Sequence, residues 1–240
     1  MATPFDPEKQ LGRVLSYYEA KSMANDPYYS VVVAVDGACR NNGQPSARAA
    51  LGVFFRRCRQ WNKSEILPRA DATSQRAELC AALRALQTVR DVVAHEPDYS
   101  VLKRVILKTD SNYLVSNMTQ WTLRWYDNGF TTARGLPVAN RDLFEQLAAC
   151  ILHLETNKGI EVLFWHVRRE QNRDADRLAN VALDAGPDAS SIWDFRIEPQ
   201  PRRQDAEECS LILNDLRVAL ERVTCLDVMD VQIKAEIDRD

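Results

Sequence analysis

The sequence VVVAVDGACRNNG, residues Val31 to Gly43, combines an apolar segment, a single carboxylate and a turn. Its five consecutive apolar residues predict a strand buried on both faces, because polar residues do not alternate with them. Asp36 follows directly, before a turn rich in Gly and Asn. A buried carboxylate is costly unless it is paired or holds a metal ion. Asp36 therefore either opens the turn, where Asp often bonds neighbouring backbone, or belongs to a site.

The composition narrows the class of protein. The chain has 240 residues, 45% of them hydrophobic, and contains no segment long and apolar enough to span a bilayer. Its first ten residues, MATPFDPEKQ, lack the basic-then-apolar order of a secretory signal. Six scattered cysteines without CxxC pairs predict free thiols in a reducing, intracellular compartment, nuclear or cytoplasmic. The net charge of −3 argues against a broad basic surface, so any nucleic-acid site must be local.

The pattern on either side of the first strand predicts an α/β fold. Apolar segments predict further strands at 49–56, 63–68, 104–110 and 160–167. Helical spacing predicts helices over 74–94, 140–157 and 172–186, with short aromatic helices over 111–129 and Ser74 as the cap of the first helix. Three consecutive strands followed by alternating helices and strands indicate a five-stranded mixed sheet with helices on both faces.

Composition divides the chain into three parts. Residues 1–29 are polar with scattered aromatics and form an N-terminal extension, with a short helix around Leu11–Ala24. Residues 30–186 carry the regular pattern and form the main domain. Residues 187–240 form a C-terminal extension with a Pro-rich linker, an amphipathic helix and an edge strand ending in a charged tail. We expect a monomer that binds no membrane, and the C-terminal extension is a candidate for binding a protein partner.

Four acids are placed where they can converge. Asp110 ends a second buried strand in the manner of Asp36, and the carboxyl ends of neighbouring strands are where open α/β sheets place their sites. Glu78 lies on the second turn of the first long helix, and Asp176 lies near the start of the last one. Four close carboxylates repel one another unless cations neutralise them, and oxygen ligands favour Mg²⁺ or Mn²⁺. Two such ions would suit displacement at a phosphodiester.

Each acid also has an ordinary structural interpretation. Asp110 could cap the helix that follows it, and Glu78 could be a solvated acid favoured near a helix N-terminus. Asp176 could pair with Arg173 or Arg177, which flank it. The sequence alone leaves these alternatives open for each residue taken singly.

Four ordered motifs carry a family resemblance. They are VDGACRNNGQ, ATSQRAELCAAL, the segment that begins LKTDSNYLVSNMTQW, and QNRDADRLANVAL, and they span Val31 to Gly186. Each motif delivers one of the four acids. Together they resemble type 1 ribonuclease H, the family of enzymes that cut the RNA strand of an RNA–DNA hybrid.

The resemblance implies a metal-dependent endoribonuclease. It makes Asp36, Glu78, Asp110 and Asp176 both the catalytic and the metal-binding residues, holding two Mg²⁺ ions, for which Mn²⁺ could substitute. The products would be a 5′-phosphate and a 3′-hydroxyl. Asp174 competes for the fourth position, but it precedes the ADRLA match, and two residues apart on a helix the pair face different ways. We therefore assign Asp176.

The resemblance also implies substrate contacts. Asn42, Ser74 and Gln75 match positions that contact the RNA backbone and its 2′-hydroxyls, the groups that distinguish RNA from DNA. Three aromatic residues fall where the family lines its groove for the DNA strand, with packing in the core as the alternative: Tyr113, Trp121 and Trp125.

A pocket for a DNA phosphate matches only in part. Thr73 and Asn140 match two of its members, but the Arg expected there has no clean counterpart. Asp71 occupies that position, and Arg69 lies two residues earlier. Ser74 also stands where an Asn is usual. Both departures concern affinity for the hybrid rather than the cleavage chemistry.

The last loop is shorter than in many family members, which carry a histidine there that assists product departure. In WHVRREQNRDAD, His166 has the spacing of that histidine when counted back from Asp176. Alternatively FWHV is the end of the last strand and the loop histidine is missing, and we prefer this alignment. Two rival functions stay open: a binding or scaffold module of the same fold with little or no turnover, and a nuclease that acts on another duplex.

Overall fold

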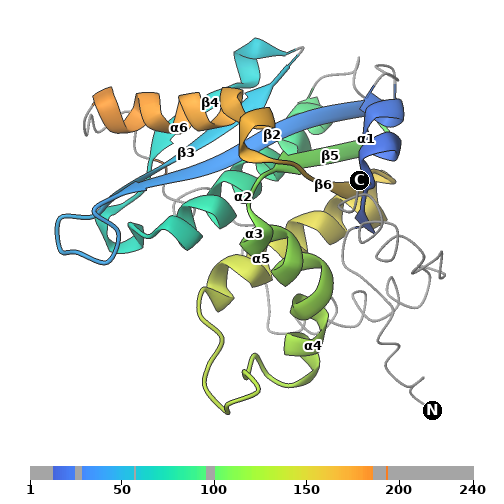
Figure 1. The fold of residues 1–240 in the computed structure, drawn as a ribbon. Coiled ribbons are helices and arrows are strands. Elements are labelled where there is room, and N and C mark those ends of the chain that lie inside the picture. The colour runs from blue at the N-terminus through green and yellow to red at the C-terminus, as the bar shows by residue number, and fades with distance from the viewer. Residues whose placement is uncertain (1–12, 25–28, 57, 96–100, 186–192, 194–240) are drawn as a thin grey trace, which may run out of the picture.

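The computed structural model describes residues 13–24, 29–56, 58–95, 101–185 and 193. The helix and strand expected in residues 187–240 lie outside these described residues. A six-stranded mixed sheet forms the centre, in the order β1-β6-β5-β2-β3-β4 (Figure 1). Its strands are β1 (Arg13–Val14), β2 (Ser30–Arg40), β3 (Arg48–Phe55), β4 (Lys63–Ile66), β5 (Arg104–Thr109) and β6 (Glu161–His166).

The predicted five-stranded mixed sheet is confirmed. Strand β2 pairs antiparallel with β3 and parallel with β5, while β3–β4 is antiparallel and β5–β6 is parallel. The N-terminal extension adds the short sixth strand, because β1 pairs parallel with β6. The first predicted strand continues beyond its expected end, since residues 37–40 of β2 pair with β3.

Helices cover both faces of the sheet. One face packs against α2 (Ser74–His95), α3 (Asn112–Ser116), α4 (Thr122–Asp127) and α5 (Arg141–Leu152) through the main hydrophobic core. The other face is covered by α1 (Tyr17–Ala24) and α6 (Arg173–Ala185), which use two smaller apolar clusters. In Figure 1, α6 lies above the sheet, and α2 and α5 lie below it. Within the described residues, no helix combines the length and the apolar character needed to cross a membrane.

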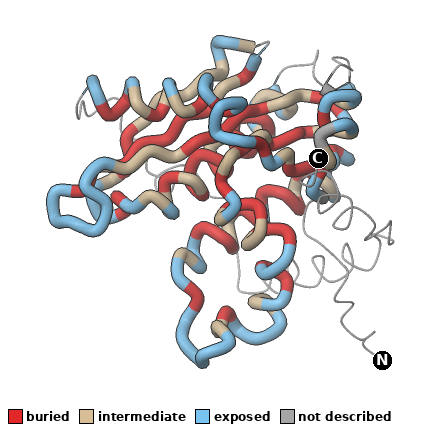
Figure 2. The backbone as a smooth tube through the Cα atoms, in the orientation of Figure 1, coloured by how far each residue is buried: buried red, intermediate tan, exposed pale blue. Residues whose placement is uncertain are grey.

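Irregular helical turns link these elements. The 3₁₀ turns are η1 (Arg59–Trp61), η2 (Arg69–Asp71) and η6 (Arg169–Gln171), and the π turns are η4 (Asn117–Trp121) and η5 (His153–Asn157). Ser74 does not cap α2, contrary to the sequence prediction. Thr73 does so, because its Oγ1 accepts a hydrogen bond of 3.2 Å from the backbone amide of Arg76. The sheet and the inner faces of the helices are buried, whereas the loops are exposed (Figure 2).

Two glycines allow helices to approach the middle of the sheet closely. A Cβ atom at Gly37 would overlap the backbone of Ala77 and Glu78 in α2, and one at Gly52 would overlap the backbone of Ala175 in α6. Gly52 is the antiparallel partner of Asp36. Glycine at these positions therefore brings one helix from each face toward the same point of the sheet, where two of the four acids follow on the helices.

Candidate active site

Asp36 lies on β2, and Asp110 directly follows the neighbouring parallel strand β5. Ala34 of β2 is in register with Lys108 of β5, so the acids two residues further along stand at the same level. Asp36 does not open a turn, because β2 continues past it to Arg40. Asp110 does not cap the next helix either. Ser111 takes that role, with its Oγ accepting from the amide of Leu114.

The charges of the acids act on one another. Asp36 is 3% exposed, and burial together with the negative charges of Asp110 and Asp176 raises its pKa to about 7. Burial and the charges of Asp36 and Asp110 raise the pKa of Glu78 well above its usual range. The structure therefore brings the four acids close together, so that their negative charges repel one another. We call this group the acidic cluster.

The amide of Asn172 fixes Asp110. Its Nδ2 donates to Oδ1 of Asp110 at 2.7 Å and to the carbonyl oxygen of Val35 at 2.9 Å, and the residue is 1% exposed. The preceding loop is held by Lys108, whose Nζ donates to the carbonyl of Gln171 at 2.5 Å. Asn172 was missing from the sequence prediction. Its place directly before the last helix, where Asn is a favoured cap, was the available signal.

Arg169 contacts the fourth acid. Its Nη2 lies 2.8 Å from Oδ1 of Asp176, so the partner of Asp176 is neither Arg173 nor Arg177. The positive charge of Arg169 also lowers the pKa of Asp36 and of Glu78, against the larger effects that raise them. The pair borders a surface pocket of about 220 Å³, lined by Arg169, Glu170, Arg173 and Asp176.

Asp174 faces a different neighbour from Asp176. Its side chain is exposed, and its negative charge acts on Lys108, where it opposes the lowering of the lysine pKa by burial. Asp176 instead acts on Asp36. The structure thus places Asp176, and not Asp174, toward the acidic cluster.

The donor set of the acidic cluster suits a hard cation. In the part of the chain that the structure describes, no three His, Cys, Asp or Glu side chains are already arranged to hold a metal ion. Asn172 engages one oxygen of Asp110, and Arg169 engages one oxygen of Asp176. Oε2 of Glu78 is nevertheless buried, with no hydrogen-bond partner in the described residues. Carboxylate oxygens whose negative charges repel one another, together with a buried oxygen that has no hydrogen-bond partner, fit Mg²⁺ or Mn²⁺.

His166 is the last residue of β6 and is exposed. Its Nε2 lies 3.4 Å from the backbone carbonyl oxygen of Asp110, not from a carboxylate oxygen. This is the position expected from the alignment in which FWHV ends the strand. The following loop reaches α6 through the short turn η6 and Asn172.

The expected RNA-contacting residues gather at the N-terminus of α2. Oδ1 of Asn42 accepts a hydrogen bond of 3.1 Å from the backbone amide of Ser74. Thr73 and Gln75 beside them are exposed. These four side chains therefore form one small polar surface next to the acidic cluster, since Glu78 lies one turn further along α2.

The three aromatic residues divide between surface and core. Trp121 is 43% exposed, and the guanidinium of Arg124 lies 5.3 Å from its ring centroid. Trp125 is half-buried and packs against Phe144, with 5.1 Å between ring centroids. The half-buried Tyr113 also packs against the core. Of these three residues, Trp121 is thus the one best placed to contact a base or sugar. Trp125 packs in the core, the alternative that the sequence left open.

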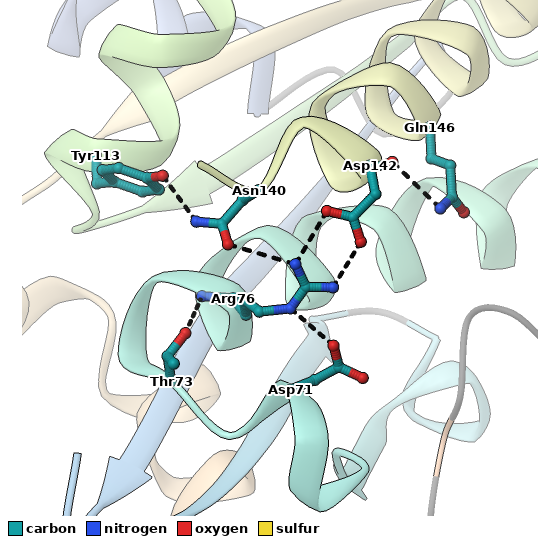
Figure 3. Close-up of polar contacts among 7 residues, drawn as sticks. All are labelled: Asp71, Thr73, Arg76, Tyr113, Asn140, Asp142 and Gln146. Atoms are coloured by element: carbon teal, nitrogen blue, oxygen red, sulfur yellow. Dashed lines mark hydrogen bonds and ion pairs between the residues drawn. The ribbon is translucent and has the colours of Figure 1, made fainter. Parts of the chain in front are cut away.

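Arg76 supplies the cation that the sequence analysis did not find beside Thr73 and Asn140. Its Nε lies 2.8 Å from Oδ1 of Asp71, and its two terminal nitrogens lie 3.0 and 2.7 Å from the two oxygens of Asp142. Figure 3 shows the guanidinium between these carboxylates. We call Arg76, Asp71, Asp142 and Asn140 the arginine network.

Asn140 connects this network to the aromatic segment. Its Oδ1 accepts from Nη1 of Arg76 at 3.3 Å, and its Nδ2 donates to the hydroxyl of Tyr113 at 3.0 Å. Arg69, the other candidate for the missing arginine, instead donates to the carbonyl of Pro45 at 3.1 Å. The signal for Arg76 in the sequence was weak, because its partners lie 5 and 66 residues away along the chain.

Comparison with known proteins identifies the family. The RNase H family model matches residues 29–184. The chain is 31% identical to Ribonuclease H1 of Mus musculus over 163 residues, which cover 66% of this chain and 52% of that protein. It is also 31% identical to Ribonuclease H of Alcanivorax borkumensis over 159 residues, covering 65% of this chain and 92% of that protein. The chain belongs to the RNase H family, and the resemblance to type 1 ribonuclease H is confirmed.

Among solved structures, LC11-RNase H1, isolated from compost by a metagenomic approach, is similar at a TM-score of 0.45 and 22% identity, covering 65% of this chain and 96% of that one. The chain spans about half the length of the first mammalian relatives that it matches.

Proposed function

We propose that this chain is a Mg²⁺-dependent endoribonuclease that hydrolyses the RNA strand of RNA–DNA hybrids, leaving 5′-phosphate and 3′-hydroxyl ends. The observation that carries the proposal is the acidic cluster. Burial, and after it the negative charges of acids from distant parts of the chain, raise the pKa values of Asp36 and Glu78. Membership of the RNase H family supports the same activity.

The metal ligands would be Asp36, Glu78, Asp110 and Asp176. Two Mg²⁺ ions bound there would activate a water molecule and stabilise the leaving oxygen. The protein contributes orientation, since Asn172 holds Asp110 in one position by a 2.7 Å hydrogen bond. It also contributes pKa control, because a carboxyl with a pKa of about 7, as at Asp36, gives up its proton near neutral pH when a cation arrives.

The substrate would lie across the polar surface at the start of α2. Asn42, Ser74 and Gln75 offer hydroxyl and amide groups that can hydrogen-bond 2′-hydroxyls and the RNA backbone, and Thr73 beside them belongs to the expected pocket for a DNA phosphate. Trp121 offers an exposed ring on which a base or sugar can stack. Both kinds of contact suit a nucleic-acid duplex with at least one RNA strand.

A cleavage assay tests the proposal. The protein is incubated at one salt concentration with a labelled hybrid, with duplex RNA and with duplex DNA. We expect cleavage of the hybrid in Mg²⁺, its loss in EDTA, and little cleavage of either uniform duplex. Cleavage of duplex RNA in preference to the hybrid would assign the chain to another substrate class.

A second candidate is a binding module with little turnover, because the ion pair of Arg169 with Asp176 engages one of the four acids. Tight hybrid binding in the same assay, without cleavage at any Mg²⁺ concentration, would establish this alternative.

A further inference from the structure

The arginine network has an inner and an outer carboxylate. The side chain of Arg76 is 13% exposed, that of Asp71 is 3% exposed and that of Asp142 is 47% exposed. Asp71 is therefore the buried counter-ion of the guanidinium, and Asp142 closes it off from solvent. One positive and two negative side chains leave this surface with a net charge of −1, beside Thr73 and Asn140, which the resemblance assigns to a pocket for a DNA phosphate.

Asp142 binds Arg76 in the way a phosphate would. Its two oxygens accept from the two terminal nitrogens of the guanidinium at 3.0 and 2.7 Å, a bidentate arrangement. Arginine recognises carboxylate and phosphate groups with the same planar fork of donors. The hydrogen bonds from Arg76 also lower the pKa of Asp142, so this carboxylate stays charged at neutral pH.

The backbone donors beside Arg76 have internal partners as well. The amide of Ser74 donates to Asn42, and the amide of Arg76 donates to Thr73. Two backbone amides at the start of α2 therefore already have partners within the chain, as the guanidinium does. Figure 3 shows Asn140 and Asp142 on one side of the Arg76 guanidinium and Asp71 on the other.

We propose that Asp142 is a specificity-determining residue: its carboxylate fills the fork of Arg76 that a backbone phosphate of the bound nucleic acid would otherwise use. The inference rests on the proposed function, since it concerns how that substrate is held. Its consequence is a chain that binds the hybrid with one phosphate contact fewer than Arg76 would allow. Binding then depends more on contacts with the 2′-hydroxyls and less on the backbone charge that every nucleic acid shares.

The test is hybrid binding without cleavage. Fluorescence anisotropy of a labelled RNA–DNA hybrid, in EDTA and over a series of salt concentrations, gives the affinity and its salt dependence. Asp142→Asn removes the charge but keeps an amide oxygen at the start of α5, so the helix retains its acceptor. Asp91→Asn is the matched control, because Asp91 pairs with Arg90 at 2.9 Å toward the other end of α2 and is also exposed.

We expect Asp142→Asn to bind about 3- to 10-fold more tightly than the wild type, and the slope of log K against log salt to steepen by about 0.7–0.9, the value for one more phosphate contact. Asp91→Asn should match the wild type. The double variant Arg76→Lys, Asp142→Asn should lose the gain, because lysine keeps the charge but lacks the fork.

Equal affinity and slope for Asp142→Asn and Asp91→Asn would overturn the inference, and so would a gain that survives Arg76→Lys. Failure of the proposed function is read separately, from absent hybrid binding and cleavage by the wild type itself. The ratio of the hybrid affinities of Asp142→Asn and Asp91→Asn reports on Asp142 alone.

Discussion

Helix α2 carries two charged residues near its start, and they stand in opposite surroundings. Arg76 lies between two carboxylates, which hold all three of its side-chain nitrogens at short distances. Glu78, two residues further on, lies among other acids and has a buried oxygen that no described group hydrogen-bonds. The arginine network lowers the pKa of its outer acid, whereas the acidic cluster raises the pKa of Asp36 and Glu78.

The difference separates two uses of carboxylates. In the arginine network the protein supplies its own cation, so the acids stabilise the fold as it stands. In the acidic cluster like charges are held together by the sheet and by the close approach of α2 and α6. Such an arrangement costs stability until a cation arrives. A cluster with unbalanced charge therefore indicates where an external ion belongs.

The largest effect is expected when one acid of the acidic cluster is replaced. Asp110→Asn should reduce hybrid cleavage by at least about 10³-fold, since a metal ligand is worth several kcal/mol in such sites. Hybrid binding should persist, and the thermal midpoint without metal should stay equal or rise because repulsion is relieved. Asp91→Asn, measured in parallel, should cleave like the wild type. Normal cleavage by Asp110→Asn would show that the acids are wrongly assigned.

The second test removes the group that orients Asp110. Asn172→Ala should lower kcat by about 10- to 100-fold, as is typical when a partner of a metal ligand is removed, with little change in KM. It should also lower the free energy of unfolding by about 1–3 kcal/mol, because the carbonyl of Val35 loses its buried donor. Asn157→Ala, at an exposed position in η5, is the control. A change in KM alone would assign Asn172 to substrate binding.

The two regions should also respond to pH with opposite signs. Asp36 has a pKa of about 7 in the folded chain, above its ordinary 3.8, so the native state binds more protons and stability falls as pH rises from about 4 to 7. In EDTA, Asp36→Asn should remove the part of this loss that Asp36 causes and be more stable than the wild type at pH 8 by a few kcal/mol, with little difference near pH 4.

Asp142 has a lowered pKa, so its stabilisation is present above its unfolded pKa and is lost as pH falls through its folded one. Asp142→Asn should therefore be slightly less stable than the wild type at pH 7, by no more than about 1 kcal/mol for a half-exposed pair. Urea unfolding between pH 3 and 8 measures both variants. The same sign for both would remove the distinction between the two regions.

A smaller change concerns Arg169, the cation that pairs with Asp176. Arg169→Gln should raise the affinity for Mg²⁺ by about 3- to 10-fold, because a positive charge near the acids competes with the metal. The increase in thermal midpoint with Mg²⁺ concentration reports this affinity without substrate. Arg177→Gln, next to Asp176 in sequence but not bonded to it, should behave as the wild type. Weaker Mg²⁺ binding in Arg169→Gln would show that the ion pair prepares the site for metal.

The sequence predicted those features that depend on local pattern. The strands were clear because their apolar residues are continuous, and each of the four acids stood at a strand or helix end. The extension of β2 beyond Asp36 was not predicted, since Asp36 and Gly37 break the apolar pattern and only pairing with β3 continues the strand.

Ion pairs that form only in the folded chain could not be predicted from the local sequence pattern either. Asp71, Arg76 and Asp142 meet only after α2 and α5 have packed together, and Arg169 reaches Asp176 across the turn η6. Sequence spacing gives no rule for such pairs, so the expected partners of Asp176 were wrong. The same limit explains why Arg76 was not considered for the place of the missing arginine.

The smallest effect distinguishes two adjacent residues at the start of α2. Thr73 caps the helix through its hydroxyl, whereas Ser74 contributes its backbone amide to Asn42. Thr73→Ala should therefore lower the free energy of unfolding by about 1 kcal/mol, the usual value of a cap, while Ser74→Ala should change it by no more than a few tenths. Urea unfolding of the two variants at pH 7 gives the comparison. Since the cap fixes the turn that carries Arg76 toward its carboxylates, Thr73→Ala should also reduce the stability difference between Asp142→Asn and the wild type, whereas Ser74→Ala should leave that difference intact.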